Sequence, residues 1–244
     1  MKKVFLLLLF TAVVSILQAQ GLKGLMKKVS KDSSLSKIIS QKPGAGLSNA
    51  DIIGGLKEAL TVGTNNGANK LSAVDGFFKD AALKILMPAE AQKVEQKLRG
   101  MGFGKQVDNA ILSMNRAAED ASKNAAPIFI NAIKGITIQD GLGILRGGDF
   151  AATNFLKEKT LLQLTEAFRP VIESSLQKVN ATKYWKTLFT TYNTFSKDQV
   201  NTDLTAYVTD KAMMGIFYQV GLEEQKIRKD PFARTTDLLK KVFN

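Results

Sequence analysis

The stretch FAATNFLKEKTLLQLTEAFRPVIESSLQKV, residues 150–179, sets the fold class because it carries a long apolar pattern. Apolar side chains that recur mainly every three or four residues lie on one face of an α-helix. In this stretch they are Leu161, Leu164, Phe168, Val171 and Leu176. Pro170 lies inside the pattern, and a proline there removes a hydrogen bond and clashes with the preceding turn. The stretch therefore predicts a helix that is kinked or split near Phe168.

The same period continues on both sides of this stretch. Ser48 and Asp51 form a capping box, which predicts a helix N-terminus just before the first series. The series are Ile52, Leu56, Leu60 and Gly63; Phe103, Val107, Ile111, Met114 and Ala118; Trp185, Leu188, Phe189 and Tyr192; Met213, Ile216, Phe217 and Val220; and Leu238, Leu239, Val242 and Phe243. They predict a single all-α, bundle-like domain over residues 47–244, with helices joined by short loops.

Breaks between the predicted helices are marked by proline, glycine and one loop. Three prolines fit the first turn of a helix, where a missing N–H costs nothing: Pro88, Pro127 and Pro231, the last with Asp230 as N-cap. Gly147 is expected to end a helix in the left-handed conformation, with Asp149 capping the next helix. Sustained two-residue alternation is nearly absent, and its best example, residues 83–87, lies in the stretch 72–88. We expect that stretch to be an ordered loop with at most a short extended piece.

The N-terminus reads as a secretion signal. Lys2 and Lys3 precede an apolar run of about 14 residues, and Ala19 is the small residue at the expected cleavage site. The run is shorter than the roughly 20 residues that a membrane-spanning helix needs, although an uncleaved anchor is the alternative. We therefore expect residues 1–19 to be removed and the protein to be periplasmic or secreted. A lipoprotein is not expected, because the chain has no Cys to carry a lipid.

Residues 20–46 form a predicted basic leader that ends in a Pro- and Gly-rich linker. Six Lys and one Asp give the leader a net charge of +5. The full chain has a net charge of +12, and removal of Lys2 and Lys3 with the signal leaves +10, so the leader carries half of the remaining charge. The six are Lys23, Lys27, Lys28, Lys31, Lys37 and Lys42. Leu22, Leu25, Met26 and Val29 make a faint helical stripe, so the Lys-rich segment 23–42 could lie on an anionic membrane surface or dock on an envelope protein. The alternative is a solvated, partly disordered leader. Nucleic acid is not an expected partner, because the basic residues are mostly Lys without interleaved aromatic residues.

Composition removes most catalytic chemistry. The chain has no His and no Cys, which excludes Ser-His-Asp and Cys-His catalysis, disulfides, and nearly all zinc, haem, iron and copper sites. Gly141, Gly143, Gly147 and Gly148 do not match a dinucleotide fingerprint, since Arg146 stands where the third glycine belongs. We expect no metal and no cofactor; the alternative is a Ca²⁺ or Mg²⁺ site made of carboxylates alone, for which no twelve-residue calcium loop appears. The enzymatic chemistry that remains is a pair of carboxylates or a Lys base.

Five segments together resemble one bacterial family, the domain of unknown function 4197. They are LSNADIIGGLKEAL (47–60), MNRAAE (114–119), RGGDFAAT (146–153), YVTDKA (207–212) and KIRKDPFARTTDLLKKVF (226–243). The resemblance covers nearly all of the chain after Gly46, with the segments in order. It implies an exported protein with a single helical domain, and it provides no catalytic residues to transfer.

Charged residues near helix ends are the candidates for a shared polar site. They are Arg116, Glu119, Arg146, Asp149, Glu166, Arg169, Asp210, Lys211, Arg228, Arg234 and Asp237. One interpretation is local pairs one helical turn apart, which add a few tenths of a kcal/mol each: Arg116 with Glu119, Glu166 with Arg169, and Glu224 with Arg228. The sharper hypothesis is convergence, either as a buried clamp between helices or as an anion-binding pocket. We favour the clamp, which predicts that Asp149→Ala lowers the melting temperature.

Two functions remain open. The first is a non-catalytic exported interaction or ligand-binding protein of the cell envelope, with helical grooves for an apolar or anionic ligand. The second is a carboxylate-dependent hydrolase of an envelope component, using acids near loops: Glu119, Asp149, Asp210 and Glu224. A pocket above roughly 300 Å³ with two carboxyls facing across it would favour the hydrolase, whereas acids bonded to arginines would favour the binding protein. We favour the binding protein.

Overall fold

The computed structural model describes residues 48–195, 197, 199–230, 233–234 and 240. The expected signal (1–19), the leader (20–46), Pro231, Asp237 and the apolar series from Leu238 to Phe243 lie outside these residues. The helices are α3 (Asn49–Ser72), the short 3₁₀ helix η1 (Ala89–Ala91), α4 (Gln92–Gly100), α5 (Gly104–Ser122), α6 (Ala125–Lys134), α7 (Ile138–Arg146), α8 (Ala151–Lys178), α9 (Ala181–Phe195) and α10 (Leu204–Lys229). No strand occurs in the described residues, so the all-α prediction is confirmed.

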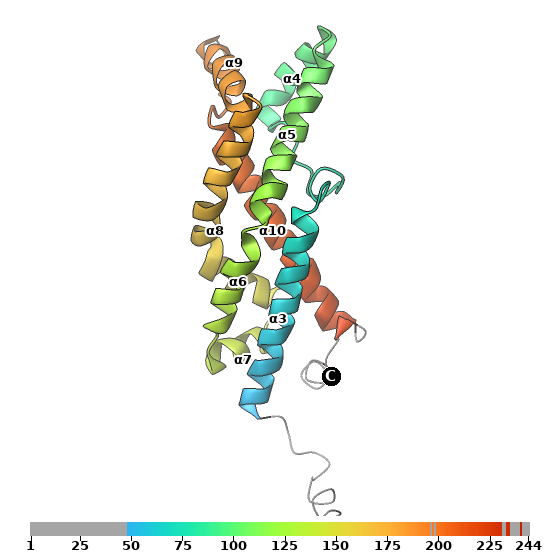
Figure 1. The fold of residues 1–244 in the computed structure, drawn as a ribbon, viewed down its shortest axis with the longest axis vertical. Coiled ribbons are helices and arrows are strands. Elements are labelled where there is room, and N and C mark those ends of the chain that lie inside the picture. Colours follow the sequence, from blue (N-terminus) through green and yellow to red (C-terminus); the bar gives the residue numbers. More distant parts are fainter. Residues whose placement is uncertain (1–47, 196, 198, 231–232, 235–239, 241–244) are drawn as a thin grey trace, which may run out of the picture. The chain divides into compact units, whose positions relative to one another are not determined.

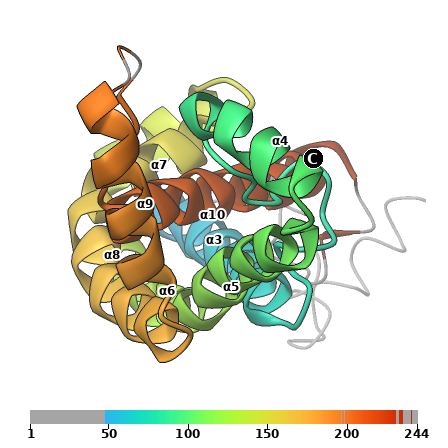
Figure 2. The same ribbon diagram turned by 90° about the horizontal axis from the view of Figure 1, so that it is seen from above.

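Helix α8 lies at the centre of the packing. It packs against α5, α6, α7, α9 and α10, and α3 packs against α10, α6, α5 and α7 (Figure 1). The end-on view shows α8 and α9 on one side, α4 and α5 on the other, and α10 crossing between them (Figure 2). The buried stripe of α8 repeats every fourth residue: Leu156, Thr160, Leu164, Phe168, Ile172 and Leu176. The predicted face is therefore slightly displaced, because Leu161 is exposed.

Pro170 does not split α8, so the predicted split is wrong, while the kink stays a prediction. The helix runs without a break from Ala151 to Lys178, within one residue at each end of the predicted 150–179. Pro170 lies on the solvent-exposed face, and so does Glu166, whose carbonyl loses its helical partner to the proline. Water can satisfy that carbonyl, so the core-facing contacts of the helix persist through the proline.

The start of α3 follows the predicted capping chemistry. Ser48 accepts from the Asp51 N–H while Asp51 accepts from the Ser48 N–H, which confirms the capping box. Thr137 and Asp140 form a second box at α7 that was not predicted, although its residue spacing is the same. Pro127 lies in the first turn of α6, and Pro88 is the N-cap of η1. Residues 73–88 form turns and irregular backbone, as expected of an ordered loop.

The break between α7 and α8 differs from the prediction. Gly147 has φ −75° and ψ 172°, which is extended rather than left-handed. A Cβ on Gly147 would lie 2.5 Å from the Cβ of Ala151, so glycine is needed here for close approach rather than for an unusual φ. The N-cap of α8 is Phe150, not Asp149, and Phe150 provides no side-chain hydrogen bond. The first turn of α8 is capped from elsewhere in the fold.

Candidate functional site: an apolar groove beside α9

A groove of about 970 Å³ opens between α4 and α5 on one side and α9 with the end of α8 on the other. Its lining is mostly apolar and includes Val94, Leu98, Val107, Met114, Trp185 and Phe189. Figure 1 shows these two pairs of helices standing apart at one end of the bundle. Since α9 packs on α8 and α10, the facing apolar sides of α5 and α9 border open space.

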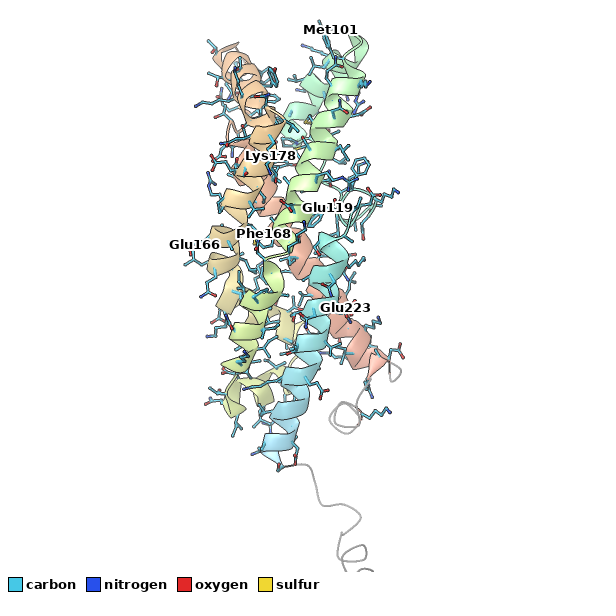
Figure 3. All side chains as sticks on the ribbon, in the orientation of Figure 1. Met101, Glu119, Glu166, Phe168, Lys178 and Glu223 are labelled. Carbon is cyan, nitrogen blue, oxygen red and sulfur yellow. The ribbon has the colours of Figure 1, made fainter. Side chains whose placement is uncertain are left out.

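Large apolar side chains stand exposed around this groove. Phe103, Val179 and Tyr184 all line it, and they are 43%, 54% and 68% exposed. Met101, which is also exposed, lies at the tip of the turn between α4 and α5 (Figure 3). Exposed apolar residues that cluster at a concave surface are typical of a binding site, whereas single ones are common on any protein.

The α9 wall is held in place by polar contacts behind it. The indole N–H of Trp185 donates to the carbonyl of Asn201 at 2.9 Å, and its ring packs on Phe189 with centroids 4.4 Å apart. Asn193 accepts from the Val200 N–H and donates to the Val200 carbonyl, both at 2.8 Å. These bonds tie α9 to the segment before α10, so the aromatic wall is preorganised.

The charged side chains that line the groove are all paired. Glu95 accepts from Arg99 at 2.9 Å, and Arg116 donates to Glu119 at 2.6 Å and to Asp75 at 2.7 Å. Asp120 accepts from Lys123 at 2.8 Å and from the Ser175 hydroxyl at 3.3 Å. The hydrogen bond from Lys123 lowers the pKa of Asp120 below its ordinary value. Asp120 is therefore ionised at neutral pH and holds no proton to donate.

Glu119 is one of two buried acids among the described residues, and both cap backbone. One of its oxygens accepts from the N–H groups of Phe77 and Phe78, both at 3.1 Å, and the other accepts from Arg116. Hydrogen bonds to Glu119 and Asp75 raise the pKa of Arg116 further above its ordinary value. This cluster fixes the loop after α3 to α5, and Asn115 adds to it by bonding both the N–H and the carbonyl of Ile85 at 2.8 Å.

Glu224 is the second buried acid, and it provides the missing cap of α8. It accepts from the Ala152 N–H at 3.0 Å, from the Thr153 N–H at 2.8 Å and from the Thr153 hydroxyl at 2.7 Å. Arg228 binds Glu224 at 2.8 Å and donates to the Ile144 carbonyl in the last turn of α7. The pair thus satisfies the end of α7 and the start of α8 at once, as the orphan groups at helix ends require.

The structure does not bring the predicted polar residues together. Arg116 with Glu119 and Arg228 with Glu224 form two separate clusters. Arg169 binds Asp203 at 2.7 Å rather than Glu166, and Asp149 binds Lys229 at 2.8 Å in an exposed pair instead of capping α8. Lys211 lies over the Tyr207 ring, and Arg234 is buried and donates to the Ile227 and Arg228 carbonyls. Arg146 and Asp210 are exposed and have no ion pair within the described ranges. Asp237 lies outside them.

Sequence reasoning expected helical grooves but could not place this one, because the apolar faces that form its walls have the same pattern as faces buried in a core. The series that begin at Phe103 and at Trp185 mark two of these walls. It also missed the acidic partners Asp75 and Asp203, which lie 41 and 34 residues from the arginines they bind. No signal in the sequence links residues so far apart without knowledge of the helix packing.

Two further features of the described residues bear on the kind of site. They contain no group of three His, Cys, Asp or Glu side chains placed to hold a metal ion. No single described helix is long and apolar enough to cross a membrane. The segments Gly104–Lys134 and Ile138–Arg146, which are bent by 109° relative to each other, are together long and apolar enough by length and composition alone.

Comparison with curated proteins and with solved structures finds no match. A family model matches residues 46–244, which is most of the chain and all of its described part. The chain therefore belongs to the family described as Protein of unknown function (DUF4197).

Proposed function

We propose that this protein is an exported, non-catalytic ligand-binding protein of the cell envelope that takes an apolar ligand into the groove between α5 and α9. The observation that carries the proposal is the groove itself, about 970 Å³ in volume with a mainly apolar lining. Small-molecule sites typically measure about 300–1,000 Å³ and combine apolar walls with few polar groups. Export rests on the sequence of residues 1–19.

The state of the acids supports binding over hydrolysis. The groove exceeds the roughly 300 Å³ that would favour a hydrolase. Its two acidic lining residues do not face each other as free carboxyls, however, because Glu95 accepts a hydrogen bond from Arg99 and Asp120 accepts one from Lys123. Carboxylate hydrolysis uses one acid whose pKa is raised so that it can donate a proton. The pKa of Asp120 is lowered instead, and so is that of exposed Asp149, through the hydrogen bond from Lys229. Glu119 and Glu224 are occupied by backbone N–H groups.

The test is binding of a neutral apolar dye, phenylnaphthylamine, whose fluorescence rises in an apolar site. We expect saturable binding to the full chain and its loss in Ala110→Phe, because Ala110 is a half-buried lining residue and the larger ring fills the space. Ala82→Phe, on an exposed residue of the loop before η1, is the matched control and should bind like the wild type. Ser113→Phe repeats the test from a second lining position.

Circular dichroism establishes that each variant is folded before binding is measured. The proposal is wrong if the wild type shows no saturable binding, or if both filling variants bind the dye as well as Ala82→Phe does. Release of product from envelope glycan, abolished by changing one acid, would instead support the hydrolase.

A further inference from the structure

We propose that the occupant of the groove is a free single-chain amphiphile with an anionic head group, a long-chain carboxylate being the simplest example. This inference rests on the proposed function and names the ligand class for the same groove. The hydrocarbon chain lies against Trp185 and Phe189, and the head group lies beside Lys178 at the edge of the groove.

The lining selects a hydrocarbon chain. The charged lining groups are already paired, and the backbone of the walls is helical, so its N–H and carbonyl groups bond within the helices. The groove therefore offers mainly apolar contact, and the uncharged polar side chains in its lining are Gln106, Asn109, Ser113, Ser175 and Tyr184. An extended peptide would bury more backbone polar groups there than these side chains can pair, which is costly, whereas an alkyl chain has none to satisfy.

The charges around the groove select an anionic head. Helix α4 carries three basic side chains and one acidic, α9 carries two basic and none acidic, and α5 carries two basic and three acidic, so these three helices together hold a net charge of +3. Several exposed lysines on the surrounding helices have no acidic partner within 4 Å in the described residues: Lys97, Lys105, Lys178, Lys183 and Lys186. A concave surface with an excess of one charge sign concentrates the opposite ion.

Lys178 is the lysine best placed to meet the head group. It lies in the last turn of α8, one residue before the lining residue Val179, and Figure 3 shows it on the part of α8 that faces α5. Its charge also acts on Asp120, which lines the groove and lies nearby. Asp120 partly offsets the positive charge here, so removing that carboxylate should favour an anion.

The single tryptophan makes the test local. Trp185 is the only Trp in the chain and it lines the groove, so its fluorescence reports this site alone. Dibrominated stearate, titrated below its aggregation limit into the full chain, should quench Trp185 saturably at one equivalent, because bromine quenches on contact. Unlabelled palmitate should compete, and affinity should rise about fourfold for each methylene added to a competing carboxylate.

Matched ligands and variants test the head group. Palmitate should bind at least fivefold more tightly than hexadecanol at low salt, and the difference should shrink at high salt. Lys178→Gln should weaken carboxylate binding about two- to fivefold, and Asp120→Asn should strengthen it, while neither changes hexadecanol binding. Lys226→Gln is the control, since it lies on α10 twenty-two residues beyond the lining residue Leu204, roughly 33 Å along the helix.

The outcomes separate this inference from the proposed function. If hexadecanol binds as tightly as palmitate, the anionic head is refuted while apolar binding stands. If neither quenches or competes at Trp185, both proposals fail. If vesicles of anionic lipid with brominated chains quench Trp185 but the monomeric carboxylate gives no one-to-one quenching, the groove binds a bilayer surface and the free amphiphile is refuted. Competition by an amphipathic peptide but not by palmitate would identify a peptide site and overturn the inference.

Discussion

Replacing Glu224 with Ala should be among the most damaging changes to the stability of this fold. Its carboxylate, on α10, accepts two N–H groups and a hydroxyl from the first turn of α8, 71 and 72 residues away in sequence. It also neutralises Arg228, whose side chain is only 15% exposed. The substitution removes an N-terminal cap, a helix–helix tie and the partner of a mostly buried cation together.

The magnitude follows from what remains unpaired. Removing one partner of a buried ion pair costs about 3–5 kcal/mol, mainly because the other charge stays buried. Arg228 keeps its bond to the Ile144 carbonyl, which places the cost nearer the lower end. For a domain of this size each kcal/mol shifts the melting temperature by about 2–4 °C, so we expect a fall of roughly 6–20 °C. Glu224→Gln keeps an oxygen for the N–H groups and should cost about 1–3 kcal/mol.

Thermal and urea unfolding, followed by helical circular dichroism, measure both changes. The control is Asp149→Ala, which breaks a pair that is 57% exposed at Asp149 and should cost less than about 1 kcal/mol. The sequence-based expectation that Asp149→Ala lowers the melting temperature depended on a buried clamp that includes Asp149, and the exposed pair does not provide that clamp. The reasoning is refuted if Glu224→Ala melts within the range of Asp149→Ala.

Three further predictions concern packing, pH and the leader. A Cβ at Gly215 would lie 2.5 Å from the ring of buried Phe77. The clash costs about 1–3 kcal/mol and the gain in helix propensity is near 1 kcal/mol. Gly215→Ala should therefore lower the free energy of unfolding, measured in urea, by up to about 2 kcal/mol. Gly143 lies in α7 with open space where a Cβ would be, so Gly143→Ala should stabilise the fold by about 0.5–1 kcal/mol. If both glycine substitutions change the free energy of unfolding in the same direction, this reasoning is contradicted. The Tyr207 hydroxyl donates to the Leu86 carbonyl, and burial raises the pKa of Tyr207 from 10.0 to about 12. Because the unfolded chain loses this proton first, the stability present below pH 10 should be lost as the pH rises to about 12. Tyr207→Phe should flatten that dependence in alkaline melting curves. The full chain should sediment with anionic vesicles more at low salt than at high salt, and a chain beginning at Leu47 should lack this salt-dependent sedimentation. Equal sedimentation of the two chains would show that the Lys-rich segment 23–42 contributes nothing.

The helical architecture could be predicted from sequence because it depends on local periodicity. The stripe around Phe168, the series from Val107 to Ala118 and the Ser48–Asp51 box each describe interactions within one helix. The box and the series lie where expected, and the stripe is slightly displaced. The i,i+3 and i,i+4 pairs Arg116–Glu119 and Glu224–Arg228 were predictable for the same reason. Pro170 was misjudged because the effect of a proline depends on which face of the helix meets water.

The spacing of apolar residues determined that this chain folds into amphipathic helices, and the lack of His and Cys determined which chemistries it cannot perform. Only the tertiary structure decided that the apolar faces of α5 and α9 border a groove rather than meet, and that Glu224 caps a helix 71 residues away. The reason is physical: burial within one helix follows a repeat of 3.6 residues. The gap between two helices depends instead on crossing geometry and on contacts between distant residues, which no local pattern encodes.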